Sequence, residues 1–269
     1  LTLPDYLSQR FDKENGSIKL VSAVVIIVFF TLYTSAGLVG GGKLFESAFG
    51  LDYQVGVFAT MFVVVAYTLL GGFLAVSLTD FVQGVIMFVA LIVVPVVAFG
   101  NFDSPQAMLG YTMETIPSFA ESYSNITILA LLSSLSWGLG YFGQPHIIVR
   151  FMAIDSVKNI KTAKRIGMGW MTVTIIGALA TGLTGLAYVN KFNIQLDDPE
   201  TIFIFFSDTL FHPLVTGFLL AAILAAVMST ISSQLLVSAS SLTEDIYRAY
   251  SKKNLSQKRL VNVSRACVF

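Results

Sequence analysis

The chain has 269 residues, of which 55% are hydrophobic and only 12% are charged, about half the charged share of an ordinary soluble domain. The 16 basic and 16 acidic side chains cancel and form no block of like charge, so we expect no nucleic-acid partner. A single cysteine excludes a disulfide framework, and the composition excludes a water-soluble globule.

Six uncharged runs reach the length of about 20 residues that a helix needs to cross the hydrocarbon core of a membrane. In chain order, we expect membrane helices at about residues 20–42, 53–70, 80–102, 124–148, 166–190 and 209–240. Strands of a membrane barrel would alternate apolar and polar residues, and continuous runs such as 24–30 and 90–94 show no alternation. The predicted fold class is therefore all-α: a single polytopic transmembrane helix bundle over residues 1–269.

The basic residues predict the orientation of these helices. If the six helices alternate in direction, fourteen of the sixteen Lys and Arg residues fall on one side. Cytoplasmic loops carry the excess of Lys and Arg, so both ends of the chain are predicted to be cytoplasmic, in the cell membrane. The acidic loops 101–121 and 191–208 would then face outside. Because the chain starts without Met and stops inside an apolar run, we expect it to be a piece of a longer protein.

The fourth predicted helix contains three glycines and a proline within eight residues, between Gly138 and Pro145. In a helix interior glycine costs about 1 kcal/mol and proline about 3 kcal/mol, so we expect the helix to break here. The break is either a kink that helps packing, or a place where freed amides and carbonyls line a binding cavity. Trp137, Tyr141 and Tyr33 lie several residues inside their apolar runs, which makes them candidates for cavity lining as well as for interfacial anchoring.

The sixth predicted helix carries a polar stripe. Ala226, Ser229, Thr230 and Ser233 follow one another at helical spacings and therefore lie on one face. Such residues commonly allow close helix packing or bond back to their own backbone. The alternative is a sodium site, because sodium is a hard ion that neutral hydroxyl and carbonyl oxygens satisfy.

Asp80 stands alone between two long uncharged runs. An ionisable residue at membrane depth is a candidate for function, because burying it without a partner is costly. The alternative is a cap: Thr79 or Asp80 would start the third helix at the cytoplasmic surface, with Gln83 as the capping-box partner.

Three motifs, in order, resemble those of the sodium:solute symporter family. They are GGFLAVSLTDFVQ at 71–83, WGLGYFGQPHI at 137–147 and AAVMSTISS at 225–233. The resemblance runs along the whole chain, and the second motif, followed by RFMA at 150–153, is most similar to the members that transport proline. It implies a sodium symporter fold of two inverted five-helix repeats, of which this chain would cover the third to eighth core helices. The first core helix, which would supply further sodium ligands, would be absent.

The resemblance also implies roles for individual residues. The backbone carbonyl of Ala226 and the hydroxyls of Ser229 and Thr230 would bind sodium, and Asp80 would take part in sodium coupling. Substrate binding or gating would fall to Tyr33, Trp137, Tyr141, Gln144 and Pro145.

The leading hypothesis is therefore sodium-coupled symport of L-proline into the cell. Sodium would be the coupling ion, membrane lipid would surround the protein, and no organic cofactor or other metal is expected. One alternative is the transmembrane sensory module of a symporter-like signalling protein, and another is a sodium symporter for a different small solute. We do not expect an enzyme, because the sequence shows no evident nucleophile with a base and no metal cluster.

Overall fold

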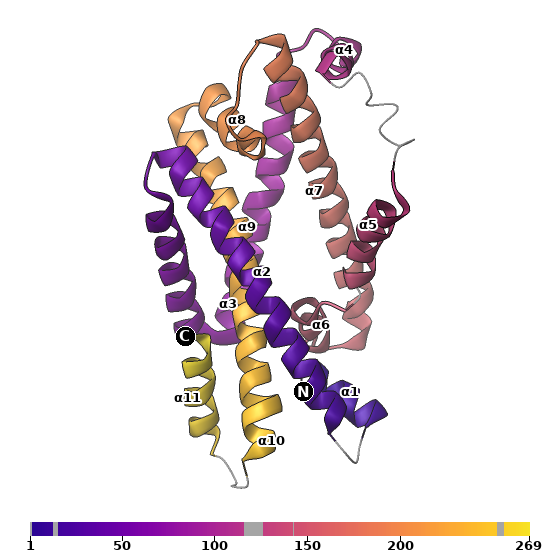
Figure 1. Cartoon of the computed structure of the whole chain (residues 1–269), viewed down its shortest axis with the longest axis vertical. Helices are drawn as coiled ribbons and strands as arrows, with labels where there is room; N and C mark the ends of the chain where they lie inside the picture. The colour runs from indigo at the N-terminus through magenta and orange to yellow at the C-terminus, as the bar shows by residue number, and fades with distance from the viewer. Residues whose placement is uncertain (1, 13–15, 116–125, 142, 252–255) are drawn as a thin grey trace. The chain divides into compact units, whose positions relative to one another are not determined.

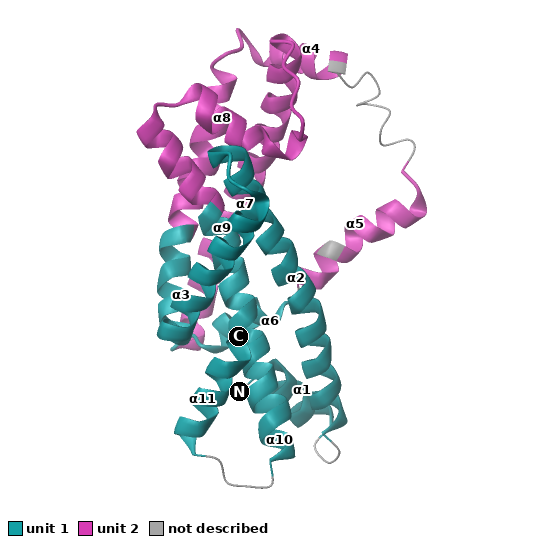
Figure 2. Cartoon of the chain, turned by 60° about the vertical axis from the view of Figure 1, so that its left-hand side comes forward, with its two compact units in different colours: residues 1–83, 144–155, 224–269 teal, residues 84–143, 156–223 magenta. Residues whose placement is uncertain are grey.

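The computed structural model describes residues 2–12, 16–115, 126–141, 143–251 and 256–269, without the side chains of Thr115 and Trp137. The chain divides into two compact units, shown in different colours in Figure 2. Residues 1–83, 144–155 and 224–269 form the first unit, and residues 84–143 and 156–223 form the second. Within the described ranges every regular element is a helix, which confirms the all-α fold class.

The first unit is built from the two ends of the chain and a short internal helix (Figure 2). Its helices are α1 (Leu3–Phe11), α2 (Ser17–Phe49), α6 (Pro145–Met152), the π-helical turn η2 (Ser241–Tyr247), α10 (Arg248–Tyr250) and α11 (Gln257–Val268). It also holds the parts of α3 (Tyr53–Phe99) up to residue 83 and of α9 (Pro213–Ser240) from residue 224. Small residues allow these helices to approach closely, since a Cβ added to Gly41 of α2 would lie 2.5 Å from the hydroxyl oxygen of Thr60.

Helix α3 consists of two limbs that meet at Gly72. Its 47 residues would extend about 70 Å if straight, about twice the thickness of a bilayer core. Gly72 has φ 58° and ψ −159°, a conformation that only glycine adopts readily, and the two limbs run in opposite directions (Figure 1). The second limb begins directly after Gly72, so the expected start at residue 80 lies inside a continuous helix. The capping alternative for Asp80 is therefore wrong.

The predicted helix at 124–148 is divided in the structure. Helix α5 (Ile128–Tyr141) ends before Gly143, the last glycine of the cluster, and α6 begins at Pro145. Gln144 is the N-cap residue, with extended backbone, and Pro145 occupies the first turn, where its missing N–H has no helical acceptor to lose. The break that the sequence predicts is therefore present.

Four of the described helices are long and apolar enough to cross a membrane. They are Ser17–Phe49, Tyr53–Phe99, Val157–Lys191 and Pro213–Tyr250. Two features explain the difference from the six expected helices: α3 combines two of them, and α5 has only 14 residues. A short α8 (Ile202–Leu210) also precedes α9, so the expected helix at 209–240 begins where α8 ends.

The second unit contains the described parts of α4 (Pro105–Thr115), α5, α7 (Val157–Lys191), η1 (Pro199–Thr201) and α8, with residues 84–99 of α3 and 213–223 of α9. Its buried core includes Val94, Tyr188, Phe206 and Leu219. Helices α3 and α7 meet at Gly177, where an added Cβ would lie 2.2 Å from a backbone oxygen of α3. Glycine is required here by close approach of two backbones.

Candidate functional site: a buried carboxylate and an oxygen cluster

The buried carboxylate of Asp80 is the centre of a polar cluster in the first unit. Its Oδ2 accepts hydrogen bonds from the guanidinium of Arg150 on α6 and from the hydroxyl of Ser233 on α9, the latter at 3.2 Å. Arg150 also donates to the Ser233 oxygen at 2.7 Å. The Asp80 side chain is 6% exposed and that of Arg150 is 40% exposed. A carboxylate at this depth requires such a partner, because an unpaired buried charge is costly.

Local sequence explains how each member of this cluster is placed. Asp80 lies on the second limb of α3, within about two turns of the backbone reversal at Gly72. Arg150 lies in the last turn of α6, where a positive charge is favoured by the helix dipole. Ser233 continues the polar stripe of α9. One oxygen of the carboxylate, Oδ1, is buried and has no hydrogen-bond partner among the described residues.

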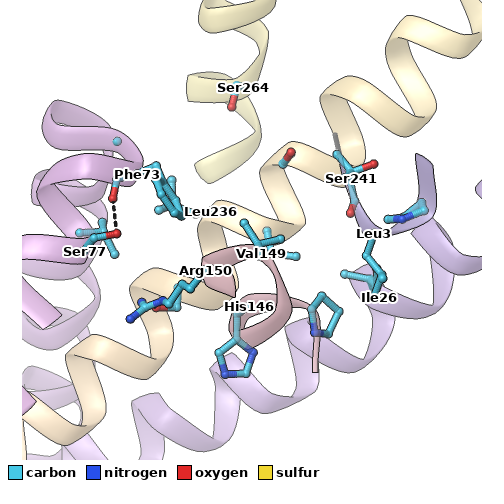
Figure 3. A pocket seen from close by; sticks show the side chains of 18 residues that line it. Leu3, Ile26, Phe73, Ser77, His146, Val149, Arg150, Leu236, Ser241 and Ser264 are labelled. Atoms are coloured by element: carbon cyan, nitrogen blue, oxygen red, sulfur yellow. Dashed lines mark hydrogen bonds between the residues drawn. The ribbon is translucent and has the colours of Figure 1, made fainter. Parts of the chain in front are cut away.

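A cavity of about 330 Å³ adjoins this cluster within the first unit. Arg150 and Ser233 line it, together with the backbone reversal at Gly72 and with residues of α1, α2, α9, η2 and α11. Figure 3 shows Phe73 and Ser77 of α3 on one side of the cavity and Leu3 and Ser241 on the other. Arg150 and Ser233 are therefore part of the wall of a partly open cavity that is large enough for a small solute.

The three residues that the resemblance assigns to sodium gather their oxygens at one point on α9. The carbonyl oxygen of Ala226 accepts hydrogen bonds from the hydroxyls of Ser229 at 3.2 Å and Thr230 at 3.0 Å. These contacts are the backbone bonds that the packing interpretation requires. They also form a cluster of hard oxygen ligands, so the arrangement is common to both interpretations.

The residues expected to bind or gate the substrate fall in both units. Tyr33 lies on α2 and is 46% exposed, and Gln144 and Pro145 start α6, where Pro145 is buried and lines the cavity. Tyr141 lies at the end of α5, in the second unit, and is 37% exposed. Trp137 lies on the same helix, and its side chain is outside the described part of the structure.

Reasoning from sequence missed the partners of Asp80. The sequence presents Arg150 as a basic residue at the start of the RFMA motif and Ser233 as part of the polar stripe and the third motif, and none of these features points to Asp80. A signal was available, because Asp80 and Arg150 have opposite charges and both stand at the predicted cytoplasmic ends of their helices. Tyr67 was also missed: its hydroxyl donates to the carbonyl of Met228 at 3.0 Å and so ties α3 to the turn that carries Ser229.

Long apolar helices that break around a buried polar cluster and a cavity are typical of membrane transporters. The chain belongs to the sodium:solute symporter family, whose sequence model matches residues 1–269.

Two curated relatives illustrate this membership. The chain is 55% identical over 268 residues to the osmoregulated proline transporter OpuE of Bacillus subtilis (strain 168), covering 100% of this chain and 54% of that protein. It is 52% identical over 277 residues to a sodium/proline symporter of Staphylococcus aureus, covering 100% of this chain and 53% of that protein. The chain therefore spans about half the length of the curated relatives it matches.

The fold is also similar to that of a Na+-coupled sialic acid symporter in a substrate-bound, outward-open state. The TM-score is 0.83 at 20% sequence identity, and the match covers 99% of this chain and 58% of that one. At this identity the likeness concerns the fold alone.

Proposed function

We propose that this chain is part of a secondary transporter that couples the entry of sodium to the uptake of L-proline. The observation that carries the proposal is the oxygen cluster of Ala226, Ser229 and Thr230 on α9, in a chain whose relatives include a sodium/proline symporter. Sodium is a substrate of this process rather than a resident cofactor, and no organic cofactor is needed.

Sodium would replace the two hydrogen bonds that the hydroxyls of Ser229 and Thr230 donate to the Ala226 carbonyl, and both hydroxyls would keep their protons. Hydroxyl hydrogens rotate freely, so Ser229 and Thr230 can turn their lone pairs toward a cation while the carbonyl oxygen stays in place. Three neutral oxygens supply part of a sodium shell. Asp80, whose Oδ1 is buried and unpartnered, would provide a negative charge for coupling elsewhere in the same unit.

Proline has a carboxylate, a secondary ammonium group and an apolar ring. Freed amides at the start of α6 suit the carboxylate. Aromatic residues suit the ring. We assign substrate binding or gating to Tyr33, Trp137, Tyr141, Gln144 and Pro145.

The driving force is sufficient for concentrative uptake. A membrane potential of 100 mV supplies about 2.3 kcal/mol per charge, and a tenfold sodium gradient adds about 1.4 kcal/mol. Together they sustain an accumulation of roughly 500-fold at one sodium per proline, since each 1.4 kcal/mol is about a factor of ten.

The proposed orientation places both ends of the chain in the cytoplasm, with the protein in the cell membrane and surrounded by lipid. The basic residues carry this proposal, because fourteen of the sixteen fall on one side if the helices alternate.

The test is uptake of labelled proline by the intact, full-length protein in sealed proteoliposomes. An inward sodium gradient should drive accumulation above the external concentration, and a choline gradient should not. Proline uptake that is independent of the sodium gradient would refute the coupling. Sodium-driven uptake of another solute with none of proline would refute the substrate, and no uptake of any solute would favour the sensory alternative.

A further inference from the structure

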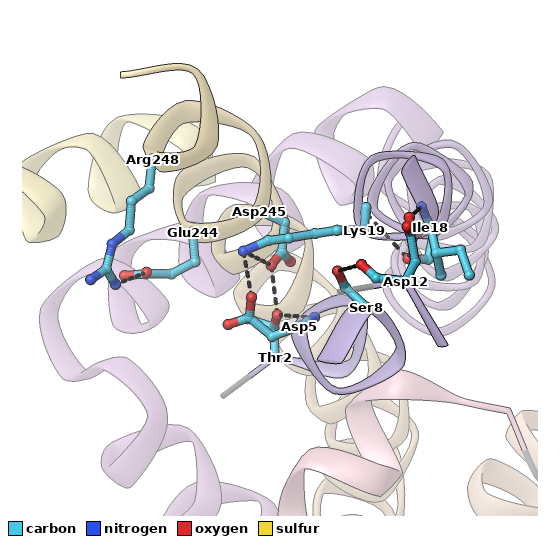
Figure 4. A network of polar contacts seen from close by, with 10 residues as sticks. Thr2, Asp5, Ser8, Asp12, Ile18, Lys19, Glu244, Asp245 and Arg248 are labelled. Atoms are coloured by element: carbon cyan, nitrogen blue, oxygen red, sulfur yellow. Dashed lines mark hydrogen bonds and ion pairs between the residues drawn. The ribbon is translucent and has the colours of Figure 1, made fainter. Parts of the chain in front are cut away.

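A second buried carboxylate, Asp245, lies in the first unit and has no role in the proposed binding of sodium or proline. Its side chain is 0% exposed. Its Oδ1 accepts a hydrogen bond from the hydroxyl of Thr2 at 2.6 Å and lies 3.5 Å from the ammonium nitrogen of Lys19. Figure 4 shows these groups together, with Asp5 also paired to Lys19. The chain therefore uses this carboxylate to hold the start of α1 and the start of α2.

Thr2 has two functions in this contact. Its hydroxyl oxygen accepts a hydrogen bond from the backbone N–H of Asp5 at 3.1 Å, which caps α1, and its hydroxyl hydrogen is donated to Asp245. One side chain thus fixes both the first turn of α1 and the position of that turn against η2.

The segment that carries Asp245 is a π-helical turn, Ser241–Tyr247. Turns of this kind are rare and occur frequently at functional sites. This turn directly continues α9, the helix that carries the proposed sodium ligands and Ser233. A movement of η2 can therefore be transmitted along one continuous helical segment.

The contact between α1 and η2 is also part of the wall of the cavity described above. Thr2, Leu3 and Pro4 of the α1 region and Ser241 of η2 line the same 330 Å³ space as Arg150 and Ser233. Displacing α1 would remove three lining residues at once. The cavity that adjoins the Asp80 cluster would then open on that side.

When α1 is in contact with η2, the hydrogen bonding of the Asp245 carboxylate is incomplete. Asp245 Oδ2 is buried and has no hydrogen-bond partner among the described residues, and the nearest cation to Oδ1 is shared with Asp5. A buried polar network with one unsatisfied member is less stable than a complete one, whereas undocking would allow water to reach both oxygens. Releasing α1 from Asp245 should therefore cost less free energy than breaking a fully satisfied buried contact.

We propose that α1 is a gate of the cavity, held closed by the contact of Asp245 with Thr2 and Lys19, and that release of this contact opens the cavity beside Arg150. The proposal rests on the proposed function for its place in a transport cycle. Asp245 acts here as a positioning residue, because it contacts neither sodium nor proline.

The experiment measures access to the cavity directly. A single cysteine at Ser240, which lines the cavity, is introduced into the intact protein after every native cysteine, Cys267 included, has been replaced by alanine. Its reaction with a hydrophilic maleimide is timed in nanodiscs, where both faces are accessible. Asp245→Asn removes the charge, and Thr2→Val removes the donor. Each should speed labelling by about tenfold, the shift expected when a charge-assisted hydrogen bond is lost from a two-state equilibrium.

Two controls separate a gate from general loosening. Glu244→Gln breaks the ion pair between Glu244 of η2 and Arg248 of α10, and should leave the labelling rate unchanged. Figure 4 shows this pair apart from the group around Asp245. A cysteine at Ser238, which lies on α9 but does not line the cavity, should label at the same rate in all variants. If Asp245→Asn fails to fold, Thr2→Val decides.

Equal rates in the parent, Asp245→Asn and Thr2→Val proteins would overturn the proposal, as would an equal increase at Ser238 or in Glu244→Gln. The measurement uses neither sodium nor proline, so its outcome is independent of the proposed function. Sodium-dependent proline binding, measured separately, should persist in Thr2→Val, whereas a variant that had merely lost its structure would lose this binding too.

Discussion

Removing Arg150 should destabilise the protein more than removing its partner Asp80. The two side chains differ in exposure, 6% for Asp80 and 40% for Arg150. Arg150→Met leaves the carboxylate buried with only the Ser233 hydroxyl, whereas Asp80→Asn leaves a guanidinium that already reaches solvent. Breaking a fully buried pair costs about 3 to 5 kcal/mol, and the exposure of Arg150 reduces this to about 2 to 3 kcal/mol for Arg150→Met. For Asp80→Asn we expect about 1 kcal/mol, the value of one hydrogen bond.

The assay is the free energy of unfolding of the purified intact protein in a double-mutant cycle. The double variant, Asp80→Asn with Arg150→Met, should be more stable than Arg150→Met alone, because no buried charge remains to be satisfied. The coupling free energy between the two sites should then be about 1 to 3 kcal/mol. Lys158→Met, on the exposed start of α7, serves as the control for loss of a positive charge and should change stability by less than about 0.5 kcal/mol.

Equal losses in the two single variants would refute this reasoning, since the argument depends on the difference in burial. Strict additivity in the double variant would show that the pair does not interact in the folded protein.

Three further predictions concern ligands and packing. Thr230→Ala should raise the sodium concentration for half-maximal uptake at least several-fold, and Ser238→Ala should not; equal effects would favour the packing interpretation of the polar stripe. Tyr141→Ala should weaken equilibrium binding of labelled proline at saturating sodium by about 1 kcal/mol, the value of one aromatic contact made by a ring that is 37% exposed, and wild-type affinity would show that the ring serves only as an anchor. Gly177→Ala should reduce the free energy of unfolding by about 1 to 3 kcal/mol, because the Cβ of the alanine would lie 2.2 Å from a backbone oxygen of α3. Gly182→Ala in the same helix, with nothing within 4 Å, is the matched control, and an equal loss there would remove the steric explanation.

The helices and their interruptions were accessible from sequence because their causes are local. The thickness of the bilayer sets the length of an apolar run, and that length identified the helical class without reference to any contact. The break before Pro145 follows from the lost N–H and ring of proline and from the glycines around it. The backbone reversal within α3 is also local in origin, because glycine alone readily adopts the φ and ψ observed at Gly72.

The boundaries of these helices were less accessible. The sequence predicts a helix that starts at Asp80, since a charged residue commonly marks the end of an apolar membrane run. In the structure the second limb of α3 instead begins directly after Gly72. The start of this helix is therefore set by the backbone reversal at Gly72 and not by the charge of Asp80. The carboxylate of Asp80 is buried in the first unit, where Arg150 and Ser233 donate hydrogen bonds to it.

The sequence by itself determined that this is a helical membrane protein with broken helices, and it identified Asp80 and the α9 hydroxyls as residues that need an explanation. Only the tertiary structure decided their partners. Arg150 is 70 positions from Asp80, and Thr2 is 243 positions from Asp245. Local propensity acts over one or two helical turns, whereas a buried carboxylate selects its partner from the helices that pack around it, and that packing depends on the whole fold.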